Sequence, residues 1–260
     1  MIGFQGKKGV VLGVANQRSI AYAVAKLLGE LGAELCLTYG PDPKARFEEN
    51  VREFAKELGA PHVLPLDVRQ DGDVTALFSA LERAWGGLDF VVHSVAFADR
   101  EDLSKPFSET SRAGWEIALE VSAYSMIPLA REAARLMRKN GGGAMVGMTF
   151  IGSMLAVPNY QVMGPAKAAL EAAIRYLARE LGPDNIRLNA ISAGAIRTLS
   201  SSGVKQFGEM LKVAGEHSAL RRNVTPEEVA QAAAFLLHPA SGGITGQSIY
   251  VDCGYNIMAN

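Results

Sequence analysis

The sequence has few of the features that mark metalloproteins, secreted proteins and nucleic-acid-binding proteins. Its two cysteines, Cys36 and Cys253, lie far apart in apolar, strand-like runs, which predicts buried thiols in a reducing compartment rather than a disulfide. The four histidines have no metal-ligand spacing, so we expect no metal site. The formal net charge of -1 provides no electrostatic reason to expect nucleic acid or an anionic membrane as a partner.

Long apolar segments are also missing. No apolar run reaches the roughly 20 residues that a membrane-spanning helix needs. A signal peptide begins with a basic segment followed by an apolar run, and the N-terminus of this chain does not have that pattern. We therefore expect a cytoplasmic protein. Of the 260 residues, 48% are hydrophobic and 20% are charged, which is typical of a soluble globular protein with a sizeable core.

Short apolar runs alternate with helical patterns along the chain. We expect strands at 8–12, 35–39, 62–66, 88–92, 144–148, 186–191 and 248–251. We expect helices at 20–31, from the Pro-rich turn to about 58, and at 74–85, 112–139, 165–181 and 226–237. This alternation predicts right-handed βαβ units and hence an α/β fold. The expected architecture is one doubly wound, Rossmann-type parallel sheet of about seven strands with helices on both faces.

No repeat, low-complexity tract or domain boundary interrupts the pattern, so residues 1–260 are predicted to form a single domain. Residues 195 to 225 have no clear period and contain the run 200–203, Ser-Ser-Ser-Gly. So long an irregular segment within a compact domain is usually a functional lid rather than a linker.

Ligands of doubly wound sheets bind beyond the carboxyl ends of the strands. The first such segment, Gly13 to Ile20, has one glycine instead of the G-x-G-x-x-G pattern. A pyrophosphate could rest on the N-terminus of the following helix, held by backbone N–H groups and the hydroxyl of Ser19. A plain turn in which Ser19 caps the helix explains the segment equally well.

Two further residues at strand ends have open interpretations. Asp67 could accept a hydrogen bond from an adenine amino group or cap the next helix, although Asp71 is the better candidate for that cap. Thr198 could bind phosphate or carboxamide, or simply turn the chain.

The second predicted strand ends in Tyr39 and Gly40, without the acidic residue that often binds the ribose hydroxyls in NAD enzymes. Lys44 and Arg46 follow and could meet a 2′-phosphate, but solvated side chains are commoner. Because no basic residue comes immediately after Tyr39, we expect NADH rather than NADPH, should the chain bind a dinucleotide.

Tyr160 and Lys167 are seven residues apart, which on an unbroken helix places them on one face about 10 Å apart along the axis. A phenol can give up a proton, and a nearby ammonium can lower its pKa and bind a sugar hydroxyl. Pro165 favours a helix that begins near this residue, with Tyr160 on the approach to it. Taken alone, such a pair usually has no function.

The pair belongs to a set of six segments whose order along the chain matches that in a known family. They are 12–21, 93–98, 159–167, 189–194, 196–198 and 243–246. Together they resemble the bacterial enoyl-acyl carrier protein reductases of fatty-acid synthesis, a divergent branch of the short-chain dehydrogenase/reductase superfamily. The most specific feature is the tyrosine-x6-lysine pair, because ordinary superfamily members have tyrosine-x3-lysine. Ordinary members also carry a serine thirteen residues before the tyrosine, where this chain has Gly147, which disfavours a simple ketoreductase.

The resemblance implies hydride transfer from NADH or NADPH to the β-carbon of a trans-2-enoyl thioester carried by acyl carrier protein. Tyr160 would stabilise the enolate oxygen and help to deliver a proton, and Lys167 would hold the ribose hydroxyls of the nicotinamide. The family is generally homotetrameric, so a homotetramer is expected.

The resemblance also assigns positions to the two ligands. The implied cofactor contacts are Gly13, Ser19, Ile20, Asp67, Val68, Val95, Lys167, Ile196, Arg197, Thr198, Leu199 and Ser200. The implied substrate pocket contains Ala98, Phe150, Met163 and Phe207, under a mobile substrate loop near 195–215 within the irregular segment 195–225.

Three positions depart from the family pattern. Phe150 stands where many members have a second tyrosine, Ala195 replaces a proline, and Gly40 replaces a polar residue near the adenosine ribose. The main alternative function is that of another short-chain dehydrogenase acting on a carbonyl or an alcohol. A dinucleotide-binding regulator without activity is a more distant alternative, because it would not need Tyr160 and Lys167 together.

Overall fold

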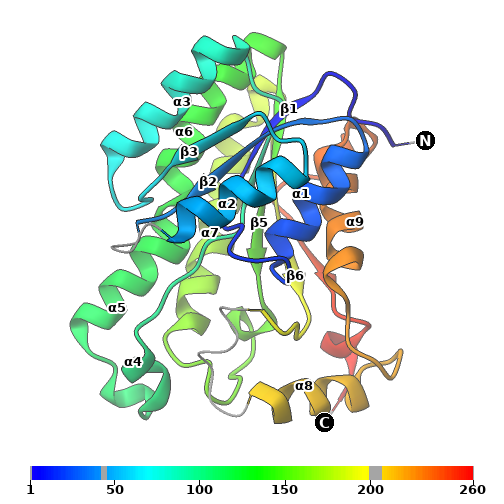
Figure 1. The fold of residues 1–260 in the computed structure, drawn as a ribbon. Coiled ribbons are helices and arrows are strands. Elements are labelled where there is room, and N and C mark those ends of the chain that lie inside the picture. Colours follow the sequence, from blue (N-terminus) through cyan, green and yellow to red (C-terminus); the bar gives the residue numbers. More distant parts are fainter. Residues whose placement is uncertain (1, 42–45, 199–206, 260) are drawn as a thin grey trace.

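The computed structural model describes residues 2–41, 46–198 and 207–259, and within them seven parallel strands form one sheet (Figure 1). The strand order is β3-β2-β1-β4-β5-β6-β7. The strands are β1 (Lys8–Val11), β2 (Glu34–Tyr39), β3 (His62–Pro65), β4 (Phe90–His93), β5 (Gly143–Thr149), β6 (Ile186–Ala193) and β7 (Ser248–Val251). The chain starts in the middle of the sheet, moves to one edge and then returns to build the other half. The predicted doubly wound α/β architecture is confirmed.

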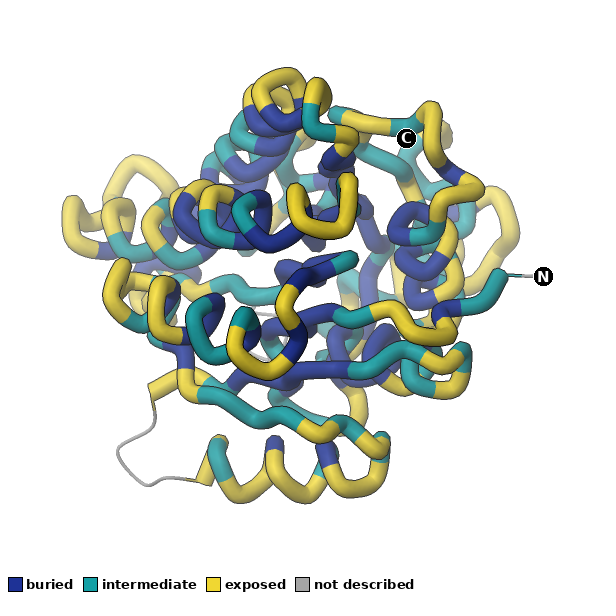
Figure 2. Tube along the Cα trace, turned by 90° about the horizontal axis from the view of Figure 1, so that it is seen from above, coloured by how far each residue is buried: buried dark blue, intermediate teal, exposed yellow. Residues whose placement is uncertain are grey.

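Helices cover both faces of the sheet. The main ones are α1 (Ile20–Glu30), α2 (Arg46–Glu57), α3 (Asp71–Trp85), α5 (Arg112–Leu119), α6 (Met126–Met137), α7 (Met163–Leu181), α8 (Phe207–His217) and α9 (Pro226–Leu237), with a short α4 (Arg100–Ser104). Apolar residues of α1, α2 and α9 form one core layer, and those of α3, α6 and α7 form the other. Figure 2 shows the buried residues inside and the exposed ones on the outer sides of the helices.

The strands contribute to both layers because successive side chains point to opposite faces. Val10 and Val91 belong to the layer of α3, α6 and α7, whereas Val11 and Val92 belong to that of α1 and α9. Strands buried on both sides read as continuous apolar runs, which is why they could be located from the sequence. Both cysteines are free thiols; Cys36 is buried in such a run, as expected, whereas Cys253 lies after β7 and is only half-buried.

The prediction of a single long helix over 112–139 was wrong. A π-helical turn, Glu120–Tyr124, separates α5 from α6. Within it the N–H of Ser125 donates to the carbonyl of Glu120, one residue farther back than in an α-helix. Pro128, in the next turn, has no N–H to give to the carbonyl of Tyr124, which weakens the regular ladder at this point.

The start of α7 differs from the prediction by two residues. The helix begins at Met163, so Pro165 is its third residue. The first four N–H groups of a helix have no partner within it, so the missing N–H of Pro165 costs nothing there. The predicted cap at Asp71 was also wrong, because Asp71 is already helical and Gln70 is the N-cap of α3.

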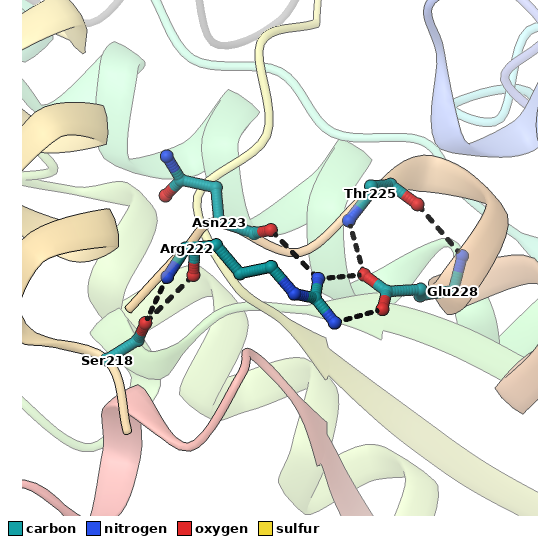
Figure 3. A network of polar contacts seen from close by, with 5 residues as sticks. All are labelled: Ser218, Arg222, Asn223, Thr225 and Glu228. Carbon is teal, nitrogen blue, oxygen red and sulfur yellow. Dashed lines mark hydrogen bonds and ion pairs between the residues drawn. The ribbon is translucent and has the colours of Figure 1, made fainter. Parts of the chain in front are cut away.

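The segment 195–225 is not irregular throughout, because it contains α8. Its far end is held to α9 by a polar network (Figure 3). Arg222 makes two hydrogen bonds with the carboxylate of Glu228, at 2.6 and 2.8 Å. Glu228 and Thr225 form a capping box at the start of α9. The hydroxyl of Ser218 bonds both the N–H and the C=O of Arg222. The pattern of this network, Thr-x-x-Glu before an apolar helix, was readable in the sequence.

Candidate active site

Tyr160 lies in the turn between β5 and α7, before the helix begins. Its two neighbours, Asn159 and Gln161, have φ of 63° and 43°, a left-handed conformation that is uncommon for residues other than glycine. The turn therefore has a tightly defined path. Such departures from ordinary backbone geometry gather at functional sites, where the surrounding structure holds them in place.

The ring of Tyr160 is confined on two sides. Phe150 packs against it with ring centroids 4.8 Å apart and planes inclined by 60°. On another side lies Gly152, where a Cβ would come within 2.5 Å of Cδ1 of Tyr160. A side chain at position 152 would therefore displace the ring. Phe150 follows directly after β5, so the pair of rings lies at the carboxyl end of that strand.

Lys167 reaches the same strand end from the second turn of α7. Its ammonium group donates a hydrogen bond of 2.8 Å to the carbonyl oxygen of Met148, and the side chain is buried. Close packing of α7 on β5 makes this contact possible. A Cβ on Gly147 would lie 2.9 Å from Cδ1 of Ile174 and 3.1 Å from Cε of Met126, so glycine leaves room for the helix.

Burial shifts the pKa of both groups away from the charged form. Desolvation raises the pKa of Tyr160 above its usual value, so the phenol stays protonated and remains a hydrogen-bond donor. The expected lowering of this pKa by a neighbouring ammonium is not borne out, since desolvation dominates. Desolvation also lowers the pKa of Lys167 to about 8, and the charge of Glu171 acts in the opposite direction.

Two substrate positions predicted from the resemblance come together with Tyr160. Ala98, Met163 and Tyr160 belong to one small apolar cluster, whose buried members also include Leu103 and Ala118. Phe150 joins them through its contact with Tyr160. Phe207 begins α8 and is not a member of this cluster. An apolar surface beside a protonated phenol suits the acyl part of a thioester.

The first turn brings Gly13 against the end of β4. Gly13 has a φ of 89°, and a Cβ on it would collide with the carbonyl oxygen of Ser94. Only glycine satisfies both conditions. Ser19 is the N-cap of α1: its hydroxyl accepts from the N–H of Tyr22 at 3.2 Å and donates to the carbonyl of Asn16 at 2.7 Å. The first turn of α1 has no acidic residue, so the helix N-terminus can attract a phosphate.

The other predicted cofactor positions lie around the same edge, with one complication. Asp67 forms an ion pair with Arg69 at 2.7 Å, which lowers the pKa of its carboxyl group. Its carboxylate is thus already engaged. Ile20 and Ile196 pack on one core layer, and Val68 and Val95 on the other. Arg197 is exposed and Thr198 half-buried, while Leu199 and Ser200 lie outside the described residues.

An acidic side chain does lie near the end of β2, although the sequence around Tyr39 contains none. Helix α2 brings Glu48 to the hydroxyl of Tyr39, and burial together with this carboxylate raises the pKa of that phenol. Glu48 also pairs with Arg52 at 2.7 Å. Glu48 and Arg52 lie nine and thirteen residues after Tyr39, so only tertiary packing brings them to the end of β2. Lys44 is outside the described residues, and Arg46 begins α2.

Two residues of the site, Glu171 and Ser122, were not predicted. Glu171 is buried and accepts a hydrogen bond of 2.7 Å from the hydroxyl of Thr149. Its spacing of four residues after Lys167 was the available signal. Ser122, in the π-helical turn, accepts from the N–H of Phe97 at 3.1 Å. Nothing in the sequence pattern marks that contact.

The expectations about metals and membranes can be compared with the described part of the chain. Within residues 2–41, 46–198 and 207–259, no group of three or more His, Cys, Asp or Glu side chains is placed to bind a metal ion. The same residues contain no helix whose length and apolar character would allow it to cross a membrane.

A family model, two relatives and one solved structure show what this chain is similar to. The family model described as enoyl-(acyl carrier protein) reductase matches residues 13–256. An NADH-dependent enoyl-acyl carrier protein reductase, FabI, of Nostoc sp. is 46% identical over 258 residues, 99% of each chain. The NADPH-dependent FabI of Staphylococcus aureus is 46% identical over 260 residues, 99% of this chain and all of the relative. A crystal structure of the reductase from Anaplasma phagocytophilum in complex with NAD is 42% identical, with a TM-score of 0.94 and coverage of 99% and 96%.

Proposed function

The chain belongs to the enoyl-(acyl carrier protein) reductase family, an oxidoreductase family of fatty-acid synthesis that uses NADH or NADPH, and we propose that Tyr160 and Lys167 carry its chemistry. The chain is accordingly an enoyl-acyl carrier protein reductase that acts on acyl carrier protein-linked enoyl thioesters. The observation that supports the site is that Tyr160, through its contact with Phe150, and Lys167, through its bond to Met148, both lie at the carboxyl end of β5, the edge where doubly wound sheets bind their ligands.

When bound, the reduced cofactor would supply a hydride to the β-carbon of the double bond, and an electron pair of the enoyl group would move to the thioester oxygen. Tyr160 is a protonated, confined phenol and donates a hydrogen bond to that oxygen as its negative charge develops. Lys167 holds the ribose hydroxyls and adds positive charge. A proton from water, delivered with the help of Tyr160, adds to the α-carbon and completes the reduction. Phe150 supplies no proton and serves to orient Tyr160 and shape the pocket.

The remaining predicted residues are proposed for binding. Gly13, Ser19 and Ile20 hold the pyrophosphate at the N-terminus of α1, since this end has no acidic residue. Val95 and Ile196 to Ser200 follow β4 and β6 and contact the nicotinamide half. Asp67 and Val68 contact the adenine end, where the N–H or C=O groups of the turn take the place of the engaged carboxylate of Asp67. Ala98, Met163 and Phe207 line the acyl pocket, with Phe207 contributed by the substrate loop.

Turnover tests this function directly. NADH oxidation is followed with crotonyl and longer trans-2-enoyl thioesters, beside the corresponding 3-ketoacyl thioesters. The proposal expects oxidation with the enoyl substrates alone. Oxidation with ketones only would favour another short-chain dehydrogenase, and cofactor binding without any turnover would favour a regulator.

For the cofactor we propose a preference for NADH. The carboxylate of Glu48 pairs with Arg52 near the end of β2 and so occupies the guanidinium that could otherwise bind a 2′-phosphate there. Comparison of kcat/KM for NADH and NADPH tests the preference, and Glu48→Gln should move the ratio toward NADPH. A preference of the unaltered protein for NADPH that is lost when Lys44 and Arg46 are neutralised would contradict it.

We propose a homotetramer because large apolar side chains are exposed in two parts of the fold. Trp115, Tyr124 and Tyr176 lie on α5, on the turn 120–124 and on α7, and Ile257 lies after β7. A tetramer with three perpendicular two-fold axes needs two different self-complementary interfaces. Light scattering after size exclusion should give a tetramer, and Tyr176→Glu, at a residue 77% exposed in the single chain, should give dimers. A monomeric unaltered protein would exclude this assembly.

We propose further that the chain is one domain in a cytoplasmic enzyme, with the residues near 195–225 as a mobile substrate loop. The two free thiols support a reducing compartment. The network of Arg222 and Glu228 supports an anchor at the far end of this loop. Limited proteolysis should therefore cut between 195 and 217, and bound NADH should protect the site. Cleavage between 218 and 225 instead would contradict the anchor.

A further inference from the structure

A buried carboxylate accompanies the lysine of the site. Glu171 and Lys167 are four residues apart on α7, so they share a face of the helix. Each is only 6% exposed. Side chains of Glu and Lys are rarely buried to this extent without an opposite charge or a set of hydrogen bonds, because both lose their hydration.

Both side chains form hydrogen bonds with residues at the same end of β5. The ammonium of Lys167 donates to the carbonyl of Met148 at 2.8 Å, and the hydroxyl of Thr149 donates to Oε1 of Glu171 at 2.7 Å. Met148 and Thr149 are consecutive, so the carboxylate is held one residue along the strand from the anchor of the ammonium. The bond from Thr149 prevents Glu171 from turning away.

Among the titratable groups around Lys167, Glu171 is the one whose charge offsets the effect of burial on the ammonium group. Burial lowers the pKa of Lys167 to about 8, and the carboxylate of Glu171 raises it. His93 on β4 is neutral at physiological pH, because burial and the charge of Lys167 lower its pKa to about 3. The phenols of Tyr160 and of Tyr250, on β7, both have raised pKa values, and Asp252 is the acid next to Tyr250.

We propose that Glu171 is a positioning residue that keeps Lys167 in its charged form at the end of β5 and so maintains the ability of that lysine to hold the cofactor. The proposal rests on the assignment of Lys167 to cofactor binding. Glu171 touches neither cofactor nor substrate in this account and acts through Lys167 alone.

A titration of Lys167 without cofactor tests the electrostatic part. The protein is labelled with lysine carrying carbon-13 at Cε, and the signal of Lys167 is identified from its loss in Lys167→Arg. Glu171→Gln keeps the shape and the bond from Thr149 but removes the charge. We expect Lys167 to titrate roughly one pH unit lower or more in this variant. Glu171→Asp, which keeps the charge, should restore most of the difference.

The matched control is Glu180→Gln, the same change on an exposed position of α7. It should leave the titration of Lys167 unchanged. Equal titration curves for the unaltered protein and Glu171→Gln would overturn the proposal. Thermal unfolding of each variant separates this result from a loss of the fold.

The affinity for NADH tests the functional part, by fluorescence of the bound cofactor between pH 6 and 9. Glu171→Gln should bind NADH several-fold more weakly near pH 8 and about equally at pH 6, where Lys167 is charged in both proteins. A shifted lysine titration with unchanged NADH affinity at every pH would overturn the link to cofactor binding and with it the role of Lys167, but not the reductase activity itself.

Discussion

Gln161 adopts a backbone conformation that its side chain does not favour. Its φ of 43° lies in the left-handed region, which is disfavoured for residues other than glycine, asparagine and aspartate. Gln161→Asn should therefore stabilise the protein, by roughly 0.5–1 kcal/mol, since asparagine relieves part of the strain. Urea unfolding measures the change. Gln161→Ala is the control, because alanine is strained in the same way. Equal stabilisation by both variants would contradict the explanation.

His93 makes stability depend on pH. It is fully buried, and its pKa is about 3 in the folded protein against an ordinary value of 6.5. Between these values the unfolded chain binds a proton that the folded chain does not, so stability falls as the pH drops from 6.5 toward 3. The loss from this residue should be about 2 kcal/mol at pH 5.

Urea unfolding at pH 7 and pH 5 measures that loss. His93→Gln should reduce the difference between the two pH values, whereas replacement of the exposed His217 by Gln should leave it unchanged. An unaltered difference in His93→Gln would show that other groups control acid stability.

The elements of secondary structure were predictable to different degrees. The strands and the helices α1, α3 and α9 were located within a few residues, because apolar periodicity and caps such as Ser19 mark them directly. The π-helical turn at 120–124 was missed because the amphipathic period continues across it. Helix α8 was missed because it has no fully buried residue to reveal a period.

The packing of α7 on β5 depends on Gly147. Gly147→Ser introduces the residue of ordinary superfamily members at this place. Because the new Cβ would press on Ile174 and Met126, we expect a loss of about 1–3 kcal/mol in stability. The displaced helix should also weaken NADH binding through Lys167. Gly72→Ser in α3, where a Cβ has open space, is the control. A Gly147→Ser protein with unchanged stability and NADH affinity would contradict this role.

On the scale of the whole molecule, the parallel sheet gathers residues from distant parts of the chain at one edge. The rule that ligands bind at the carboxyl ends of strands located Gly13, Phe150 and the approach to α7 from the sequence. This rule could not predict contacts that depend on how the helices pack. Glu48 reaches Tyr39 and Asp67 is engaged by Arg69 only in the folded protein.

The central claim is that Tyr160 donates a hydrogen bond to the developing enolate. Steady-state kinetics of Tyr160→Phe with an enoyl thioester, together with the dissociation constant for NADH, test it most directly. The account predicts a fall in kcat on the order of 100-fold, with the fold and NADH affinity unchanged, because the donor acts mainly in the transition state. A variant with unchanged kcat and only a higher KM would contradict the assignment of Tyr160.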